Sequence, residues 1–160
     1  QHIGAGVFGQ PILLPPNPEG LQISISHSGE LGMALAVETG HPMALDIEQF
    51  RPDRIPAIKS ALTSHELAQA YSCDLPHEQA LMLFWCMKEA LSKVLKCGLT
   101  TQFHVLELAE IESENGQLTA SFRYFMQYKA IAFMLGECGC AIALPRKTWG
   151  LPVASIRAAF

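Results

Sequence analysis

The chain has 160 residues, of which 49% are apolar and 16% are charged, and its formal net charge is −4. This length and composition predict one ordered domain with a hydrophobic core and exclude an intrinsically disordered chain. The net negative charge does not favour binding to nucleic acid, so we expect no nucleic-acid partner. No apolar run approaches the roughly 20 residues of a membrane-spanning helix, so we expect no membrane partner either.

The five cysteines give an expectation about the redox environment. Their number is odd, and no two of them are spaced as Cys-x-x-Cys. Cys138 and Cys140 flank one glycine, a spacing compatible with metal binding or a strained disulfide, although small residues packed in a strand are favoured. We therefore expect reduced thiols and, since no signal peptide is visible, a cytoplasmic protein.

The first part of the chain is predicted to be a linker followed by strands. Residues 1–21 are rich in glycine and proline and are expected to form a loop or linker remnant. A domain is expected over residues 22–144. Alternating and apolar patterns with intervening turn residues predict an antiparallel meander of three strands, over residues 22–26, 32–38 and 43–48.

Helices are expected next. Residues 55–62 form a short helix, and Thr63 with Glu66 three positions later is a capping box for a second helix that runs to about Tyr71. Apolar residues at helical spacing predict a long helix over residues 77–96.

The rest of the domain reads as strands. They are expected over residues 103–108, 117–125, 130–135 and 140–144, with Asn115-Gly116 as a hairpin turn between the first two. The tail, residues 145–160, has no assigned structure. The predicted fold class is α+β, an antiparallel sheet with helices packed on one face.

A pair of carboxylates stands out in the third predicted strand. Strand side chains alternate, so Asp46 and Glu48 share one side, whereas Leu45 and Ile47 share the other. Two carboxylates this close repel each other unless a cation neutralises them, and Mg²⁺ is the hard divalent ion that suits oxygen ligands. The alternative is that both are simply solvated at the end of a strand.

The long helix carries further charged residues. Trp85, Glu89 and Lys93 are four positions apart and share a face, and Lys88 lies in the neighbouring row. The alternative is that Glu89 and Lys93 form an ordinary i,i+4 salt bridge within the helix. In the functional interpretation, Glu89 is a third carboxylate for the metal ion. Lys88 and Lys93 then bind phosphates, as cleavage of a diphosphate requires.

His27 lies between Ser26 and Ser28 at the end of the first predicted strand. A histidine there is more often a local hydrogen-bonding residue, but this triplet also offers donors for phosphate oxygens. A Ser-His-Asp triad and a zinc site with His41 are weaker alternatives, because neither a nucleophile-elbow motif nor a familiar zinc spacing is present.

In order, the motifs resemble those of the 4′-phosphopantetheinyl transferases of the Sfp type. They read Ile25-Ser26-His27-Ser28, Asp46-Ile47-Glu48, and the nine residues from Trp85 to Lys93. The resemblance implies transfer of the phosphopantetheine arm of coenzyme A to a serine of an apo acyl or peptidyl carrier protein, with release of adenosine 3′,5′-bisphosphate. It also implies a pseudo-duplicated fold of two similar halves, of which residues 22–144 would be the end of the first half and all of the second.

The resemblance also implies residue roles. Asp46, Glu48 and Glu89 would hold Mg²⁺, and Lys88 and Lys93 would stabilise the diphosphate. Ser26 and His27 would contact a phosphate of coenzyme A. Glu89 would be the general base for the carrier serine, through a water molecule or directly.

The chain departs from the Sfp-type pattern in its first half. Such enzymes have two similar halves with the site between them, and the basic residues of the first half have no counterpart before His27. We therefore expect a missing half, or a homo-oligomer, to complete the cleft and to cover an apolar sheet face. Two other functions stay open: a non-catalytic module that binds coenzyme A or a carrier protein, and another Mg²⁺-dependent phosphotransferase or pyrophosphohydrolase.

Overall fold

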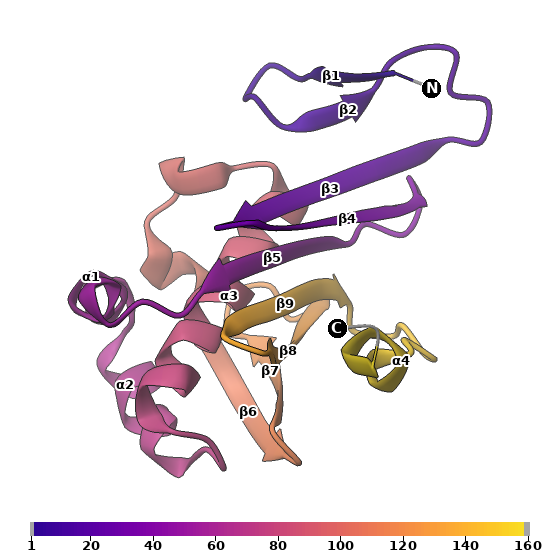
Figure 1. Ribbon diagram of the computed structural model, residues 1–160. Coiled ribbons are helices and arrows are strands. Elements are labelled where there is room, and N and C mark those ends of the chain that lie inside the picture. Colours follow the sequence, from indigo (N-terminus) through magenta and orange to yellow (C-terminus); the bar gives the residue numbers. More distant parts are fainter. Residues whose placement is uncertain (1, 159–160) are drawn as a thin grey trace.

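Residues 2–158 are described in a computed structural model of the chain (Figure 1). The strands are β1 (Ile3–Ala5), β2 (Pro11–Leu13), β3 (Leu21–Ser28), β4 (Leu31–Glu38), β5 (Ala44–Gln49), β6 (Leu108–Glu114), β7 (Gln117–Phe122), β8 (Tyr128–Leu135) and β9 (Cys138–Pro145). The α-helices are α1 (Ile55–Ala61), α2 (Ser64–Gln69), α3 (His77–Leu95) and α4 (Val153–Ala158).

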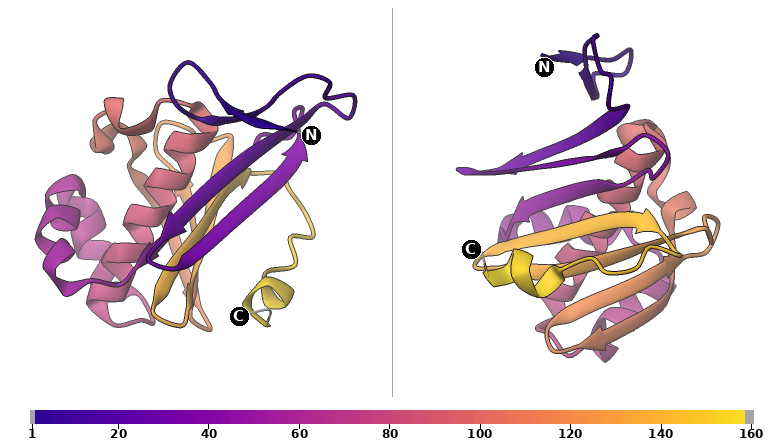
Figure 2. Two further views of the ribbon diagram at one scale, coloured as in Figure 1. Left: turned by 45° about the horizontal axis from the view of Figure 1, so that its top comes forward. Right: turned by 90° about the vertical axis from the view of Figure 1, so that its right-hand side faces the viewer.

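The main sheet has five antiparallel strands in the order β5-β9-β8-β7-β6. The helices α1, α2 and α3 pack on one of its faces (Figure 1), so the predicted α+β class is confirmed. Before β5, β1 pairs with β2 and β3 pairs with β4, so that the described residues form two hairpins separate from the main sheet. Figure 1 and the right view of Figure 2 show the β1–β2 hairpin beyond β3, at the end opposite to β6.

The predicted meander of three strands is wrong at its third strand. β5 does not pair with β4 but with β9, with Asp46 opposite Ala141. This pairing places Met43 and Leu45 in an apolar cluster with residues of β8 and β9. The physical reason is that burial of apolar side chains on a distant strand outweighs the short connection to β4.

The two faces of the sheet differ in the size of their side chains. Under α3 the strands carry mainly small residues, namely Ala130, Ala132, Gly139, Ala141 and Ala143. A Cβ added at Gly139 would lie 2.8 Å from Met82 Cε and 3.0 Å from Leu83 Cδ2. Small residues therefore let α3 pack closely against the sheet and bring its side chains within reach of β5.

The opposite face carries large side chains and is covered by the chain itself. Ile131, Phe133, Ile142 and Leu144 pack there with Met33, Leu35 and Val37 of β4 and with Leu151, Val153 and Ile156 of the tail. The tail thus has a role that the sequence did not suggest. Because the chain itself covers this face, burial against a second chain is not required here, and oligomerisation stays a prediction.

Local signals in the sequence were largely reliable. The capping box at Thr63 and Glu66 is formed, and the Asn115-Gly116 turn has the expected positive φ angles, 51° and 71°. The predicted strand over residues 103–108 is wrong, because Phe103–Leu106 form a 3₁₀ turn in which Phe103 stacks on Trp85 with ring centroids 4.6 Å apart. Residues 1–21 are not wholly loop, since they include the β1–β2 hairpin.

The helices in the described part of the chain include none that is both long and apolar enough to cross a membrane.

Candidate active site

Asp46 is the most buried of the candidate carboxylates. It lies on the side of β5 that faces α3, where Lys93 of that helix contacts it, and is 5% exposed. Its Oδ1 accepts hydrogen bonds from Lys93 Nζ at 2.8 Å and from Ser26 Oγ at 2.9 Å, whereas the buried Oδ2 has no partner among the described residues. Burial raises the pKa of Asp46 above its ordinary value, although Lys93 and Ser26 oppose the shift.

Glu48 lies two residues further along β5 and is only partly buried. Its Oε2 accepts from Ser28 Oγ at 3.0 Å, and its Oε1 accepts from Arg54 at 2.7 Å. Arg54, which lies just before α1, was not identified from the sequence. It comes close to Glu48 only because the chain turns after β5. The one sequence signal for this ion pair was that a basic residue follows Glu48 by six positions.

Glu89 approaches the same place from α3. Burial, followed by the negative charge of Asp46, raises its pKa from 4.5 to about 7, and Glu48 contributes in the same direction. Lys93 and Arg54 oppose the shift. Carboxylates of β5 and α3 are thus close enough for their charges to affect one another.

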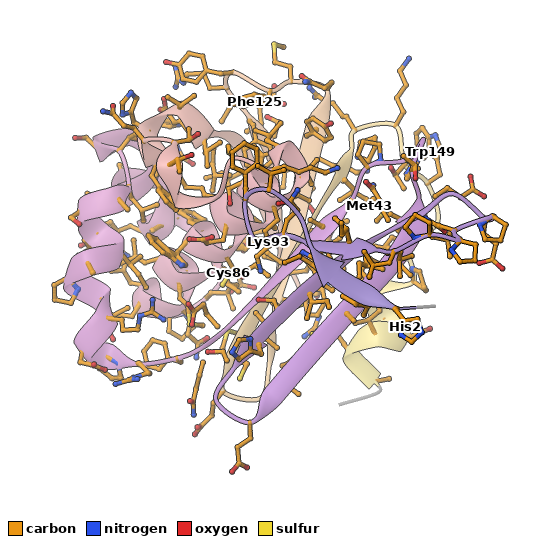
Figure 3. All side chains as sticks on the ribbon, turned by 90° about the horizontal axis from the view of Figure 1, so that it is seen from above. His2, Met43, Cys86, Lys93, Phe125 and Trp149 are labelled. Atoms are coloured by element: carbon orange, nitrogen blue, oxygen red, sulfur yellow. The ribbon has the colours of Figure 1, made fainter. Side chains whose placement is uncertain are left out.

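Lys93 links the helix to the strand. The ordinary i,i+4 salt bridge with Glu89 is not among the ion pairs of residues 2–158; instead Lys93 Nζ bonds to Asp46 and to the carbonyl oxygen of Leu45, at 3.2 Å. Its side chain is 28% exposed, so this ion pair is only partly buried. Figure 3 shows Lys93 near the centre of the molecule when it is viewed from above.

Lys88 lies in a different environment. Its side chain is fully buried, and Nζ lies 2.9 and 3.0 Å from the two carboxylate oxygens of Glu66, which is also fully buried. Five residues along an α-helix rotate a side chain by about 140°, so Lys88 and Lys93 point away from each other. The structure separates Lys88 from the other site residues, and we exclude it from the phosphate-binding set.

Ser26 and His27 point in opposite directions because they are neighbours on a strand. The buried Ser26 hydroxyl donates to Asp46 and accepts from the backbone N–H of Ile47 at 3.3 Å. A hydroxyl has one proton to donate, so Ser26 has none left for a phosphate of coenzyme A. His27 is exposed and lies apart from the carboxylates, on the other side of β3.

A cavity of about 590 Å³ opens next to Lys93. It lies between the β1–β2 hairpin, the first half of β3 and the end of α3, and its wall includes Phe8, Ile12, Ile23, Lys93 and Lys96. The volume is in the range that a small organic ligand fills. Its wall is mostly apolar with two ammonium groups, which suits a molecule that has both an apolar arm and phosphates.

The carboxylates match the donor chemistry that a hard divalent cation requires. Asp46, Glu48 and Glu89 supply only oxygen ligands, and Asp46 Oδ2 is a buried acceptor without a donor among the described residues. The residues therefore fit Mg²⁺ by chemistry. Their side chains are not drawn together as a ligand cluster, since residues 2–158 contain no group of three or more His, Cys, Asp or Glu placed to hold an ion.

The neighbouring thiol of Cys86 stays neutral. Burial, followed by the charges of Asp46 and Glu48, raises its pKa well above the ordinary value. Cys86 lies on α3 below Lys93 in the view of Figure 3. It therefore contributes an apolar wall rather than a reactive thiolate next to Asp46.

Comparison with known proteins identifies one family. The family model for the 4′-phosphopantetheinyl transferase superfamily matches residues 42–142, a segment that begins just before β5 and ends in β9. No curated protein matches the chain. The matched segment contains Asp46, Glu48, Glu89 and Lys93, whereas Ser26 and His27 lie before it.

Proposed function

Because the chain belongs to the 4′-phosphopantetheinyl transferase superfamily, we propose that it transfers the 4′-phosphopantetheine arm of coenzyme A to a serine of an apo acyl or peptidyl carrier protein. The observation that carries this proposal is the ion pair between Asp46 of β5 and Lys93 of α3, with Glu48 and Glu89 near enough for their charges to affect Asp46 or one another. Carboxylates for a metal ion, a cationic side chain for the diphosphate and a carboxylate that can act as base are the groups that phosphoryl transfer requires.

In the proposed step, the serine oxygen attacks the phosphorus that carries the pantetheine arm. A new oxygen–phosphorus bond forms, the bond to the bridging oxygen of the diphosphate breaks, and adenosine 3′,5′-bisphosphate leaves with the bond electrons. Glu89 accepts the serine proton, directly or through a water molecule.

Asp46 and Glu48, with Glu89, would hold Mg²⁺. When bound, the ion supplies positive charge to the diphosphate oxygens. Lys93 lies beside Asp46 with its side chain partly exposed, so it is placed to stabilise the charge that develops on the leaving phosphate.

The cavity beside Lys93 is the proposed site for part of coenzyme A. Its mostly apolar wall suits the pantetheine arm, and Lys96 extends the positive charge of Lys93 along the end of α3. His27 is exposed and therefore available to a phosphate distant from the diphosphate. The resemblance assigned this role to Ser26 as well, but its proton is already donated to Asp46.

The proposal is tested by incubating the chain with coenzyme A, Mg²⁺ and a panel of apo carrier proteins from fatty acid, polyketide and nonribosomal peptide synthesis. Mass spectrometry should show phosphopantetheine added to the carrier serine, and the addition should stop when Mg²⁺ is chelated. A carrier in which this serine is replaced by alanine is the control. Release of the bisphosphate without a carrier would indicate a pyrophosphohydrolase instead, and coenzyme A binding without turnover would indicate a binding module.

We expect Lys93→Ala to lower turnover by about 10²-fold, as removal of a preorganised donor to transition-state charge does. The exposed Lys59 on α1 provides a matched control, because Lys59→Ala removes the same charge away from the site. Both variants should be assayed at a temperature where circular dichroism shows them folded. Equal turnover in the two variants would show that Lys93 is only the partner of Asp46 in a structural ion pair.

A further inference from the structure

Three serines of β3 join this strand to β5. The hydroxyls of Ser24, Ser26 and Ser28 accept hydrogen bonds from the backbone N–H groups of residues 45, 47 and 49, at 3.1, 3.3 and 2.9 Å. The two strands therefore run side by side in the same direction with a constant offset of 21 residues. Side-chain hydroxyls satisfy the edge of β5 that faces β3, while its other edge pairs with β9.

The three hydroxyls differ in where their own protons point. Ser24 faces the backbone carbonyl of Leu45, at 3.5 Å. Ser26 donates to Asp46 Oδ1 at 2.9 Å, and Ser28 donates to Glu48 Oε2 at 3.0 Å. Only the second and third serines of this ladder therefore touch carboxylates of the proposed metal site.

Each of these carboxylates is held by one hydroxyl and one cationic side chain. On Asp46, Ser26 and Lys93 both bond to Oδ1, so the carboxylate plane is restrained and the second oxygen has no bond to a described residue. On Glu48, Ser28 and Arg54 bond to different oxygens. In other proteins, residues that do not touch the metal orient its ligands through hydrogen bonds of this kind.

We infer that Ser26 and Ser28 are positioning residues whose hydrogen bonds hold Asp46 and Glu48 in place for a divalent cation. This inference rests on the function proposed above. It gives the serines a different role from direct contact with coenzyme A, and it explains why two serines alternate along β3 at the level of the two carboxylates. Ser24 belongs to the same ladder but touches neither carboxylate.

The test compares Ser26→Ala with Ser24→Ala in the full chain. Both serines are 7% exposed, and both variants lose a hydroxyl that accepts from a backbone N–H of β5, so their structural costs are matched. Titration with Mn²⁺ alone, followed by electron paramagnetic resonance of the free ion, reports cation affinity without any turnover. We expect Ser26→Ala to weaken Mn²⁺ binding about tenfold, the effect of one hydrogen bond to a charged group, and Ser24→Ala to change it less than about threefold.

Two further variants keep the comparison informative. Ser26→Thr retains the hydroxyl in a residue that strands accept, so it should restore Mn²⁺ affinity. Ser28→Ala acts at the partly exposed end of the strand and should weaken binding in the same direction even if Ser26→Ala fails to fold. The Mg²⁺ concentration for half-maximal transferase activity should rise in the same variants that bind Mn²⁺ weakly.

Equal Mn²⁺ affinity in Ser26→Ala, Ser28→Ala and Ser24→Ala would overturn the inference. If the wild-type chain still binds Mn²⁺ and modifies a carrier protein in that case, only the role of the serines is wrong. A wild-type chain that neither binds Mn²⁺ nor modifies a carrier would overturn the proposed function and, with it, this inference.

Discussion

Replacing Glu89 by glutamine is expected to reduce phosphopantetheine transfer by about 10²- to 10⁴-fold, the usual contribution of a general base. The amide keeps the size and polarity of the side chain but cannot accept the serine proton. Turnover should be measured with saturating coenzyme A and carrier protein, so that weakened binding does not enter the comparison. A loss that appears only in the Michaelis constant for coenzyme A would contradict the assignment of Glu89 as base.

The same substitution is expected to stabilise the fold at alkaline pH. The folded chain raises the pKa of Glu89 from 4.5 to about 7, so between these values the folded state binds more protons than the unfolded state. The free energy of unfolding contributed by this group therefore falls as pH rises through this window. At pH 8, Glu89→Gln should be more stable than the wild type by on the order of 2 to 3 kcal/mol.

Urea unfolding at pH 4 and pH 8 in a chelating buffer measures this difference. Near pH 4 the wild-type carboxyl is protonated in both states, so the two chains should be about equally stable. Glu112, an exposed residue of β6, supplies the control, since Glu112→Gln should not reproduce the gain at pH 8. An equal gain in both variants would trace the effect to net charge rather than to the cluster around Glu89.

Lys88→Met is expected to destabilise the fold by about 3–5 kcal/mol, because it leaves the Glu66 carboxylate buried without a cation. The Glu66 oxygens also accept from the backbone N–H groups of Thr63 and Leu108, at 2.7 and 2.9 Å, and Lys88 Nζ donates to the carbonyl oxygen of Ala61 at 3.2 Å. This one ion pair therefore joins the end of α1, the start of α2, α3 and the start of β6.

Chemical denaturation measures the loss, and two further variants interpret it. Glu66→Gln in the Lys88→Met background removes the remaining buried charge while an amide oxygen can still accept from the backbone, so it should recover part of the stability. Arg51 and Asp53 form an exposed ion pair with side chains 59% and 67% exposed, and Arg51→Ala should cost at most about 1 kcal/mol. If Lys88→Met lowered the free energy of unfolding by a similarly small amount, the buried ion pair would not be what holds these elements together.

Much of the local structure was determined by patterns that are short in sequence. The period of apolar residues placed α3, the Thr63–Glu66 pair placed the start of α2, and Asn115-Gly116 placed the turn before β7. These signals act between residues a few positions apart, so they can be recognised without knowledge of the rest of the fold. The same alternation placed Asp46 and Glu48 on one side of a strand, and the three motifs in order indicated the superfamily that the family model then matched.

The tertiary structure alone decided which residues meet. β5 pairs with β9, about a hundred positions away, because that edge buries its apolar side, and the same pairing turns Asp46 toward α3. Lys93 consequently bonds to Asp46 rather than to Glu89, its neighbour on the helix, and Arg54 reaches Glu48. Lys88 lies in the same motif as Lys93, yet the helical rotation between them directs it to Glu66 in the core. Ion pairs and buried hydrogen bonds depend on distance in space, and their partners here are set by the burial of apolar surface far away in sequence.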